Sequence, residues 1–139
     1  MRTRTLSRTS VAAHSLALAT VNALTFLTGL WLAFSPFQLD QQLSGGGFNG
    51  YWNDVLVGTV VVLCGAAQLV APATAHVWRP VLPLAGAWLI VAPTALGYND
   101  GTPAPATTTS DVASGAVVLT LWAIGVAVLS RALHDRSKR

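Results

Sequence analysis

Two aspartates, Asp54 and Asp111, are the residues whose type and position most suggest chemistry. Each stands immediately before a long apolar stretch. A carboxylate in this position can cap a helix, because it accepts hydrogen bonds from free N–H groups and meets the positive end of the helix dipole. Two carboxylates that approach each other could instead bind a proton or an ion. The sequence favours capping, with an ion or proton site as the alternative.

The other side chains that could bind metal or act in catalysis are dispersed. The histidines lie in separate segments, without the His-x-x-His or Cys pairing that is typical of a zinc site. The single cysteine, Cys64, has no partner for an intramolecular disulfide and is expected to pack inside an apolar helix. No nucleophile, base and orienting group stand in a recognisable spacing. We therefore predict no enzyme, no cofactor and no metal site. The histidines are His14, His76 and His134.

Long apolar stretches are the elements that must position these residues. Of 139 residues, 53% are hydrophobic and only 9% are charged, whereas a soluble domain has roughly 25% charged residues. Four stretches lack Asp, Glu, Lys and Arg and approach the length that a helix needs to cross a bilayer, the third being the shortest. Their apolar runs are continuous and do not alternate as barrel strands do, so we predict an all-α membrane protein with four transmembrane helices. The stretches are residues 15–36, 55–71, 81–96 and 112–130.

The basic residues predict the orientation of these helices. All eight lie in the N-terminal arm, between the second and third stretches, or in the C-terminal tail. Because cytoplasmic loops are enriched in Lys and Arg, both termini are expected in the cytoplasm. Attraction to anionic lipid explains these charges, so no nucleic acid partner is expected. The basic start could also belong to a cleaved signal peptide, but the following apolar run is long for one, and an uncleaved first helix fits better.

The chain repeats itself at one constant offset, the offset that separates Asp54 from Asp111. The matched residues include Trp, Pro, Asp and Gly, which coincide by chance less often than aliphatic residues do. Each copy contains two predicted helices, so the copies are expected to be parallel and related by a pseudo-twofold axis along the membrane normal. The repeat signature is Gly29, Trp31, Pro36, Asp54 and Gly58 in the first copy, and Gly86, Trp88, Pro93, Asp111 and Gly115 in the second.

The repeat predicts two parallel-repeat helical hairpins, and its matched residues have structural interpretations. The prolines are expected to end or bend the first and third helices, the tryptophans to pack between hairpins or lie in an aromatic belt, and the glycines to allow close backbone approach. The predicted divisions are a cytoplasmic basic arm (1–14), a first two-helix repeat (15–72), a cytoplasmic turn (73–78), a second two-helix repeat (79–130) and a cytoplasmic basic tail (131–139).

Around the matched Trp and Pro residues the sequence resembles the SPW repeat family of small bacterial membrane proteins. The signatures read Gly-Leu-Trp-Leu-Ala-Phe-Ser-Pro-Phe from Gly29 and Gly-Ala-Trp-Leu-Ile-Val-Ala-Pro-Thr from Gly86. Two features depart from the family name: Phe37 and Thr94 stand where it would place Trp, and Ala92 replaces Ser. The resemblance covers most of the chain. It implies a helical bundle in a bacterial plasma membrane and no established biochemical role.

The expected function is a noncatalytic structural or accessory component of the lipid bilayer, as a homo-oligomer or in a larger membrane complex. The alternative is a small transporter or channel that uses Asp54 and Asp111. Few polar residues are predicted at mid-depth, which opposes transport. One face of the second helix, along Asp54, Gly58, Gly65 and Gln68, is expected to point inward. A symmetric pore is also disfavoured, because Trp122 of the fourth helix occupies the position that Gly65 has in the second.

Overall fold

The computed structural model describes residues 2–39, 49–98 and 105–138, and every regular element within these ranges is a helix. This confirms the predicted all-helical class. The first and last helices include the basic ends of the chain and so extend beyond the stretches predicted to span the membrane. In chain order the elements are α1 (Arg2–Gln38), α2 (Gly50–Val70), the short 3-10 helix η1 (Pro72–Thr74), α3 (Ala75–Trp78), α4 (Val81–Ala95) and α5 (Pro105–Ser137).

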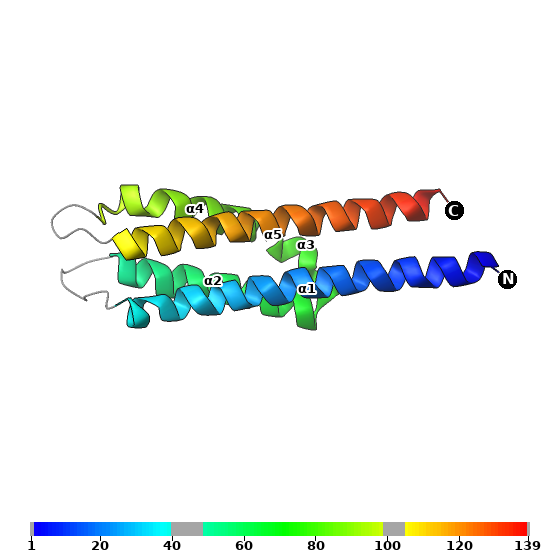
Figure 1. Ribbon diagram of the computed structural model, residues 1–139, viewed down its shortest axis with the longest axis horizontal. Helices are drawn as coiled ribbons and strands as arrows, with labels where there is room; N and C mark the ends of the chain where they lie inside the picture. Colours follow the sequence, from blue (N-terminus) through cyan, green and yellow to red (C-terminus); the bar gives the residue numbers. More distant parts are fainter. Residues whose placement is uncertain (1, 40–48, 99–104, 139) are drawn as a thin grey trace.

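The long helices form two pairs that lie against each other. In the first helical pair α1 packs along α2, and in the second α4 packs along α5 (Figure 1). Contacts of α1 with α5 and of α2 with α4 join the two pairs. The start of α1 and the end of α5 lie at the same end of the molecule (Figure 1). Below, the end with the termini is called the basic end, and the other the distal end.

Three helical segments are long and apolar enough to cross a membrane: Val11–Gln38, Gly50–Val70 and Pro105–Asp135. α4 is too short to qualify by itself. Together with the Pro72–Trp78 segment before it, α4 forms a fourth candidate span that is bent by 45°. Pro80 lies at this break, where a residue without a backbone N–H interrupts the helical hydrogen bonds. The described residues therefore contain three candidate spans, or four if the bent pair is one span.

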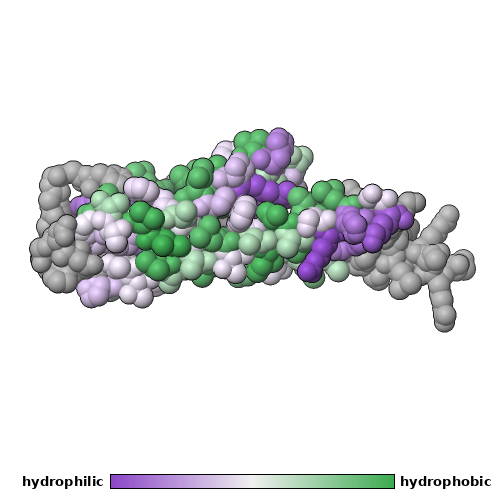
Figure 2. Space-filling view, turned by 90° about the horizontal axis from the view of Figure 1, so that it is seen from above, coloured by the Kyte–Doolittle hydropathy of each residue, from purple (hydrophilic) through white to green (hydrophobic). Residues whose placement is uncertain are grey.

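Large apolar side chains face outward, while several polar side chains are buried. Leu27, Phe34, Leu63 and Leu84 each expose more than half of their surface. Figure 2 shows hydrophobic residues over the middle of the long axis and strongly hydrophilic residues towards the basic end. Such extensive apolar exposure marks a surface that contacts lipid or another protein, and lipid is the solvent that fits apolar helices of this length.

Glycines let the helices of each pair touch through their backbones. A Cβ atom added to Gly58 would lie 2.5 Å from the backbone nitrogen of Ala33 and 3.0 Å from the carbonyl oxygen of Gly29. A Cβ atom added to Gly115 would lie 2.7 Å from the carbonyl oxygen of Gly86. Only glycine fits these positions without a shift of the backbone. The predicted close approach at small residues is thus confirmed, at the matched positions of both pairs.

The helices α2 and α5 begin earlier than predicted. α2 starts at Gly50, and the side chain of Asn49 caps it by accepting a hydrogen bond from the backbone nitrogen of Trp52 at 3.3 Å. α5 starts at Pro105, a residue whose fixed φ and missing N–H suit a first helical position. Asp54 and Asp111 consequently lie inside helices. The prediction that they act as N-caps is wrong, because residues farther upstream begin both helices.

The ends of α1 and α4 agree with the predicted role of the prolines. Pro36 and Pro93 lie inside α1 and α4, close to the last residues of these helices. After α4, Gly97 adopts a φ of 62°, and the N–H of Tyr98 bonds to the carbonyl oxygen of Pro93 at 3.0 Å. This left-handed turn is a common way to end a helix. It leaves Tyr98 half-buried, in contact with the start of α5.

Candidate functional site

Asp54 and Asp111 meet inside the molecule near the distal end. Both side chains are 0% exposed. The amide nitrogen Nδ2 of Asn53 lies 3.3 Å from Oδ1 of Asp54 and 3.4 Å from Oδ2 of Asp111, so a single amide bridges the two carboxyl groups. This group of side chains is termed the carboxylate cluster. It comprises Ser35, Asn53, Asp54, Trp88, Tyr98 and Asp111.

Asn53 and Tyr98 supply the donors at the centre of the carboxylate cluster. The Tyr98 hydroxyl donates to Oδ2 of Asp111 at 2.9 Å and lies 3.1 Å from Nδ2 of Asn53. Burial raises the pKa of Tyr98, and the negative charges of Asp111 and Asp54 raise it further. Tyr98 therefore keeps its proton at neutral pH and remains a hydrogen-bond donor. These contacts satisfy Oδ2 of Asp111, whereas its Oδ1 is buried with no hydrogen-bond partner among the described residues.

The carboxylate cluster joins all four long helices. Ser35 of α1 places its hydroxyl 3.5 Å from Oδ2 of Asp54 on α2. Trp88 of α4 donates from Nε1 to Oδ1 of Asn53 at 2.7 Å. Asp111 brings in α5. Burying a carboxylate costs several kcal/mol unless hydrogen bonds compensate for the lost water, so this network has to form when the helices assemble.

The two signature tryptophans make reciprocal contacts between the helical pairs. Trp31 on α1 donates from Nε1 to the hydroxyl of Ser110 on α5 at 3.3 Å. Trp88 on α4 donates to Asn53 on α2, as described above. Trp31 matches Trp88 in the sequence repeat, and Asn53 matches Ser110. Each tryptophan thus reaches the matched residue of the opposite pair, while much of its ring stays exposed, with 52% of Trp31 and 41% of Trp88 accessible.

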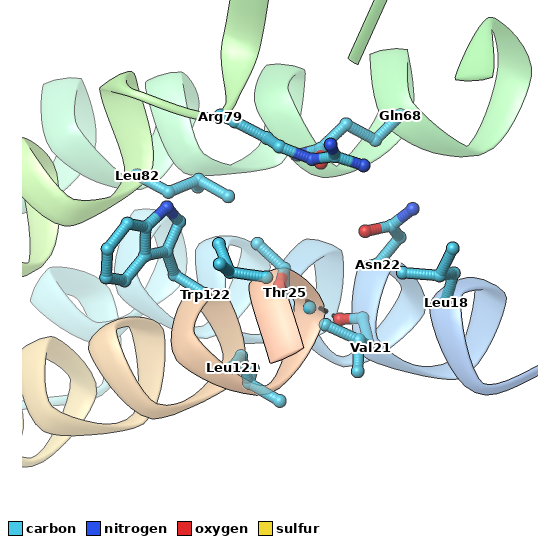
Figure 3. A pocket seen from close by; sticks show the side chains of 11 residues that line it. Leu18, Val21, Asn22, Thr25, Gln68, Arg79, Leu82, Leu121 and Trp122 are labelled. Atoms are coloured by element: carbon cyan, nitrogen blue, oxygen red, sulfur yellow. Dashed lines mark hydrogen bonds between the residues drawn. The ribbon is translucent and has the colours of Figure 1, made fainter. Parts of the chain in front are cut away.

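A second polar region lies towards the basic end, around a cavity of about 20 Å³. Arg79 and Gln68 form one wall of this cavity, and Asn22 and Thr25 of α1 form the facing wall (Figure 3). The indole of Trp122 on α5 closes one side. We term this the arginine cavity. A volume of this size accommodates about one water molecule or one ligand atom.

An apolar cluster separates the carboxylate cluster from the arginine cavity. It consists of Val61 and Cys64 on α2, Leu82 on α4 and Val118 on α5, all of which are buried. Along α2, Val61 and Cys64 follow Asp54 and precede Gln68, so they lie between the two polar regions. The predicted packing role of Cys64 is confirmed, because its thiol is buried in this cluster.

The remaining candidates of the sequence analysis fall outside these two regions. His14 is half-buried, and His76 and His134 are exposed, each on a different element. Within the described parts of the chain, no three His, Cys, Asp or Glu side chains are grouped as metal ligands would be. On α2, Gly58, Gly65 and Gln68 are all buried, as predicted for a helix face that points inward.

Sequence reasoning missed three central residues. Asn53 directly precedes Asp54, and its position before a carboxylate on a buried face was the available signal. Tyr98 could have been found from Gly97, since a glycine directly after an apolar helix often turns the next residue back onto it. Arg79 was counted only as a topology charge, and no sequence pattern indicates that it lines a cavity with Asn22.

The fold and the site define a class of all-helical protein with apolar helices of membrane-spanning length and a buried polar core. The SPW repeat domain matches residues 19–130, and the chain therefore belongs to the SPW repeat family. This match spans the signature residues and both helical pairs. No curated protein and no solved structure gives a significant match to the chain.

Proposed function

We propose that this protein is a noncatalytic structural or accessory component of the bacterial plasma membrane. It crosses the bilayer four times as two duplicated hairpins, α1–α2 and α4–α5, with both termini in the cytoplasm. The exposed apolar surfaces, the shared end of the termini and the one-sided distribution of basic residues support this topology. The reciprocal tryptophan contacts support the duplication.

The observation that carries this proposal is the way the buried polar groups are used. The carboxylate cluster links α1, α2, α4 and α5 to one another. Buried apolar side chains of α2, α4 and α5 occupy the core between it and the arginine cavity. Interhelical hydrogen bonds in a buried core are typical of bundle assembly. A rigid helical unit of this kind suits an architectural role in a homo-oligomer or a larger complex.

Topology is tested with single cysteines placed at Ser7 and Ser137 in a Cys64→Ala background. An impermeant maleimide applied to intact cells should leave both cysteines unlabelled and should label both after the membrane is permeabilised. Labelling of either cysteine in intact cells would contradict the proposed orientation.

The accessory role is tested by extracting the tagged protein from its own membrane into nanodiscs, followed by sizing and mass spectrometry. A stoichiometric partner or a defined homo-oligomer is the expected result. A monodisperse monomer without a copurifying protein would contradict the accessory role.

A transporter or channel is the second candidate, and one observation favours it. Asp54 and Asp111 converge, and Oδ1 of Asp111 has an unused acceptor position in the described core. Buried acids in membrane helices often mark ion or proton pathways. Proton or cation flux into proteoliposomes that is abolished by Asp54→Asn and Asp111→Asn would support transport. Flux equal to that of empty vesicles would leave the architectural proposal in place.

A further inference from the structure

The arginine cavity contains a cation and polar side chains that the architectural role does not use. Arg79 is half-buried at the break before α4, and it lies across the cavity from Asn22 (Figure 3). Gln68 is only 5% exposed, and its Nε2 donates to the carbonyl oxygen of Cys64 at 3.2 Å. All residues that line the cavity belong to the described part of the chain, and none of them is Asp or Glu.

This set of side chains matches the chemistry of a phosphate group. A guanidinium is always charged and presents several N–H donors, which makes arginine a common partner of phosphate oxygens. Asn22 adds an amide donor from the facing helix. The volume of about 20 Å³ admits one oxygen and excludes a whole headgroup, so the rest of the ligand must remain outside the cavity. A ligand with a protruding phosphate oxygen and a flexible remainder meets this requirement.

We propose that the arginine cavity binds one oxygen of a phosphate group, with Arg79 as its cationic partner and Asn22 as a second donor. The phosphate belongs to an anionic phospholipid of the cytoplasmic leaflet, an assignment that rests on the proposed membrane topology. Gln68 lies near the end of α2 and Arg79 at the break before α4, so in the proposed topology the cavity lies in the cytoplasmic half of the bundle, where a phospholipid of that leaflet can reach it. Basic pockets between transmembrane helices on the cytoplasmic side bind such headgroups in other proteins.

Arg79→Gln and Arg131→Gln form a matched pair for the test. Both remove one positive charge from the basic end, but Arg131 is exposed on α5 and does not line the cavity. The wild type and both variants are reconstituted into phosphatidylcholine nanodiscs that contain a minority of phosphatidylglycerol. After release into mild detergent, native mass spectrometry counts the retained phosphatidylglycerol. Asn22→Ala is a second variant that leaves the arginine in place.

We expect the wild type and Arg131→Gln to retain phosphatidylglycerol in preference to phosphatidylcholine. Loss of a charge-assisted contact should lower this retention about tenfold in Arg79→Gln and by a smaller factor in Asn22→Ala. Equal retention by all four proteins would overturn the proposal. Equal loss in Arg79→Gln and Arg131→Gln would also overturn it, since it would indicate a general charge effect. If Arg79→Gln does not fold, the comparison of Asn22→Ala with the wild type decides.

Free phosphate is distinguished from lipid by a separate arm. Inorganic phosphate is added to the delipidated protein in detergent, and the melting temperature is recorded against chloride at the same ionic strength. A rise in melting temperature that depends on Arg79, without preferential retention of phosphatidylglycerol, would show that the ligand is soluble phosphate and would overturn the lipid assignment. Extraction of the protein from membranes by alkaline carbonate would contradict the membrane proposal itself. Unchanged lipid retention in an integral protein contradicts only this inference.

Discussion

The two helical pairs share their packing geometry but differ in the polar groups that they contribute. In each pair two matched glycines bring the helices into backbone contact. Each pair also sends one tryptophan to the other. Yet the first pair supplies Asn53, whose amide bridges both carboxyl groups, whereas the second has Ser110 at the matched position.

The two pairs thus have the same helix packing, but they place different polar groups in the core. The contacts made by matched identical residues place the helices. The positions where the two copies differ decide which polar groups face the core: Ser35 matches Ala92, and Gln68 matches Gly125. Accordingly, α1 supplies the serine hydroxyl of the carboxylate cluster, and α2 supplies the buried amide of the arginine cavity.

The largest expected effect comes from the glycine contacts. A Cβ at Gly58 would meet backbone atoms of Ala33 at 2.5 and 2.9 Å, whereas the close neighbours at Gly115 include the flexible side chain of Ile90. Gly58→Ala should therefore destabilise the bundle by roughly 1–3 kcal/mol, and by more than Gly115→Ala does. Unfolding by SDS in mixed micelles measures both variants. Equal losses of unfolding free energy would mean that the two helical pairs tolerate an added methyl group equally well.

Removing the bridging amide should have the next largest effect. Asn53→Ala leaves the buried carboxyl groups of Asp54 and Asp111 without a shared donor, at a cost of about 1–3 kcal/mol. Ser110→Ala removes only the acceptor of the Trp31 indole and should cost less. The same SDS titration reports both values. A larger loss for Ser110→Ala would show that the amide is not central to the carboxylate cluster.

The tryptophan contacts should differ more modestly. Trp88 donates to Asn53 at 2.7 Å, and Trp31 donates to Ser110 at 3.3 Å. Replacing each indole by phenylalanine keeps an aromatic ring but removes the donor. Hydrogen bonds between membrane helices contribute roughly 0.6 kcal/mol on average. Both substitutions should therefore cost a fraction of a kcal/mol, and Trp88→Phe should lower the unfolding free energy more than Trp31→Phe does. The difference in unfolding free energy between the two variants is the readout, and a reversed order would contradict the observed geometry.

The smallest expected effect is a loss of stability that involves Tyr98 and that is seen only at alkaline pH. Because burial and the nearby carboxylates raise its pKa in the folded protein above the ordinary value of 10.0, the unfolded chain releases this proton first. Stability should therefore fall as the pH rises above about 10, and Tyr98→Phe should reduce that fall. SDS unfolding at pH 8 and pH 11 tests this difference. An identical pH dependence in the wild type and in Tyr98→Phe would exclude Tyr98 as the cause.

Much of the architecture could be predicted from the sequence because it depends on local composition. Apolar runs without charge predict helices that can lie in lipid, and small residues at matched positions predict close approach of helix backbones. The inward face of Gly58, Gly65 and Gln68 followed from helical spacing alone. The SPW repeat resemblance was likewise confirmed over residues 19–130.

Helix ends and polar contacts were decided by the tertiary structure. The pattern of apolar residues locates the apolar helices but not their first turns, so it predicts caps at Asp54 and Asp111 although Asn49 and Pro105 lie at the starts of these helices farther upstream. Whether two distant carboxyl groups meet depends on how the helical pairs pack, which no local pattern contains.

The sequence by itself determined the helical class, the apolar stretches, the placement of the basic residues outside them and the matched positions, because each is set by residue type and spacing along the chain. Only the tertiary structure decided that Asn53 bridges Asp54 and Asp111, and that Arg79 faces Asn22 across a cavity. The physical reason is that these contacts join different helices. Their distances are fixed by backbone contact at the glycines and by the bend before α4, and both arise when the two pairs assemble.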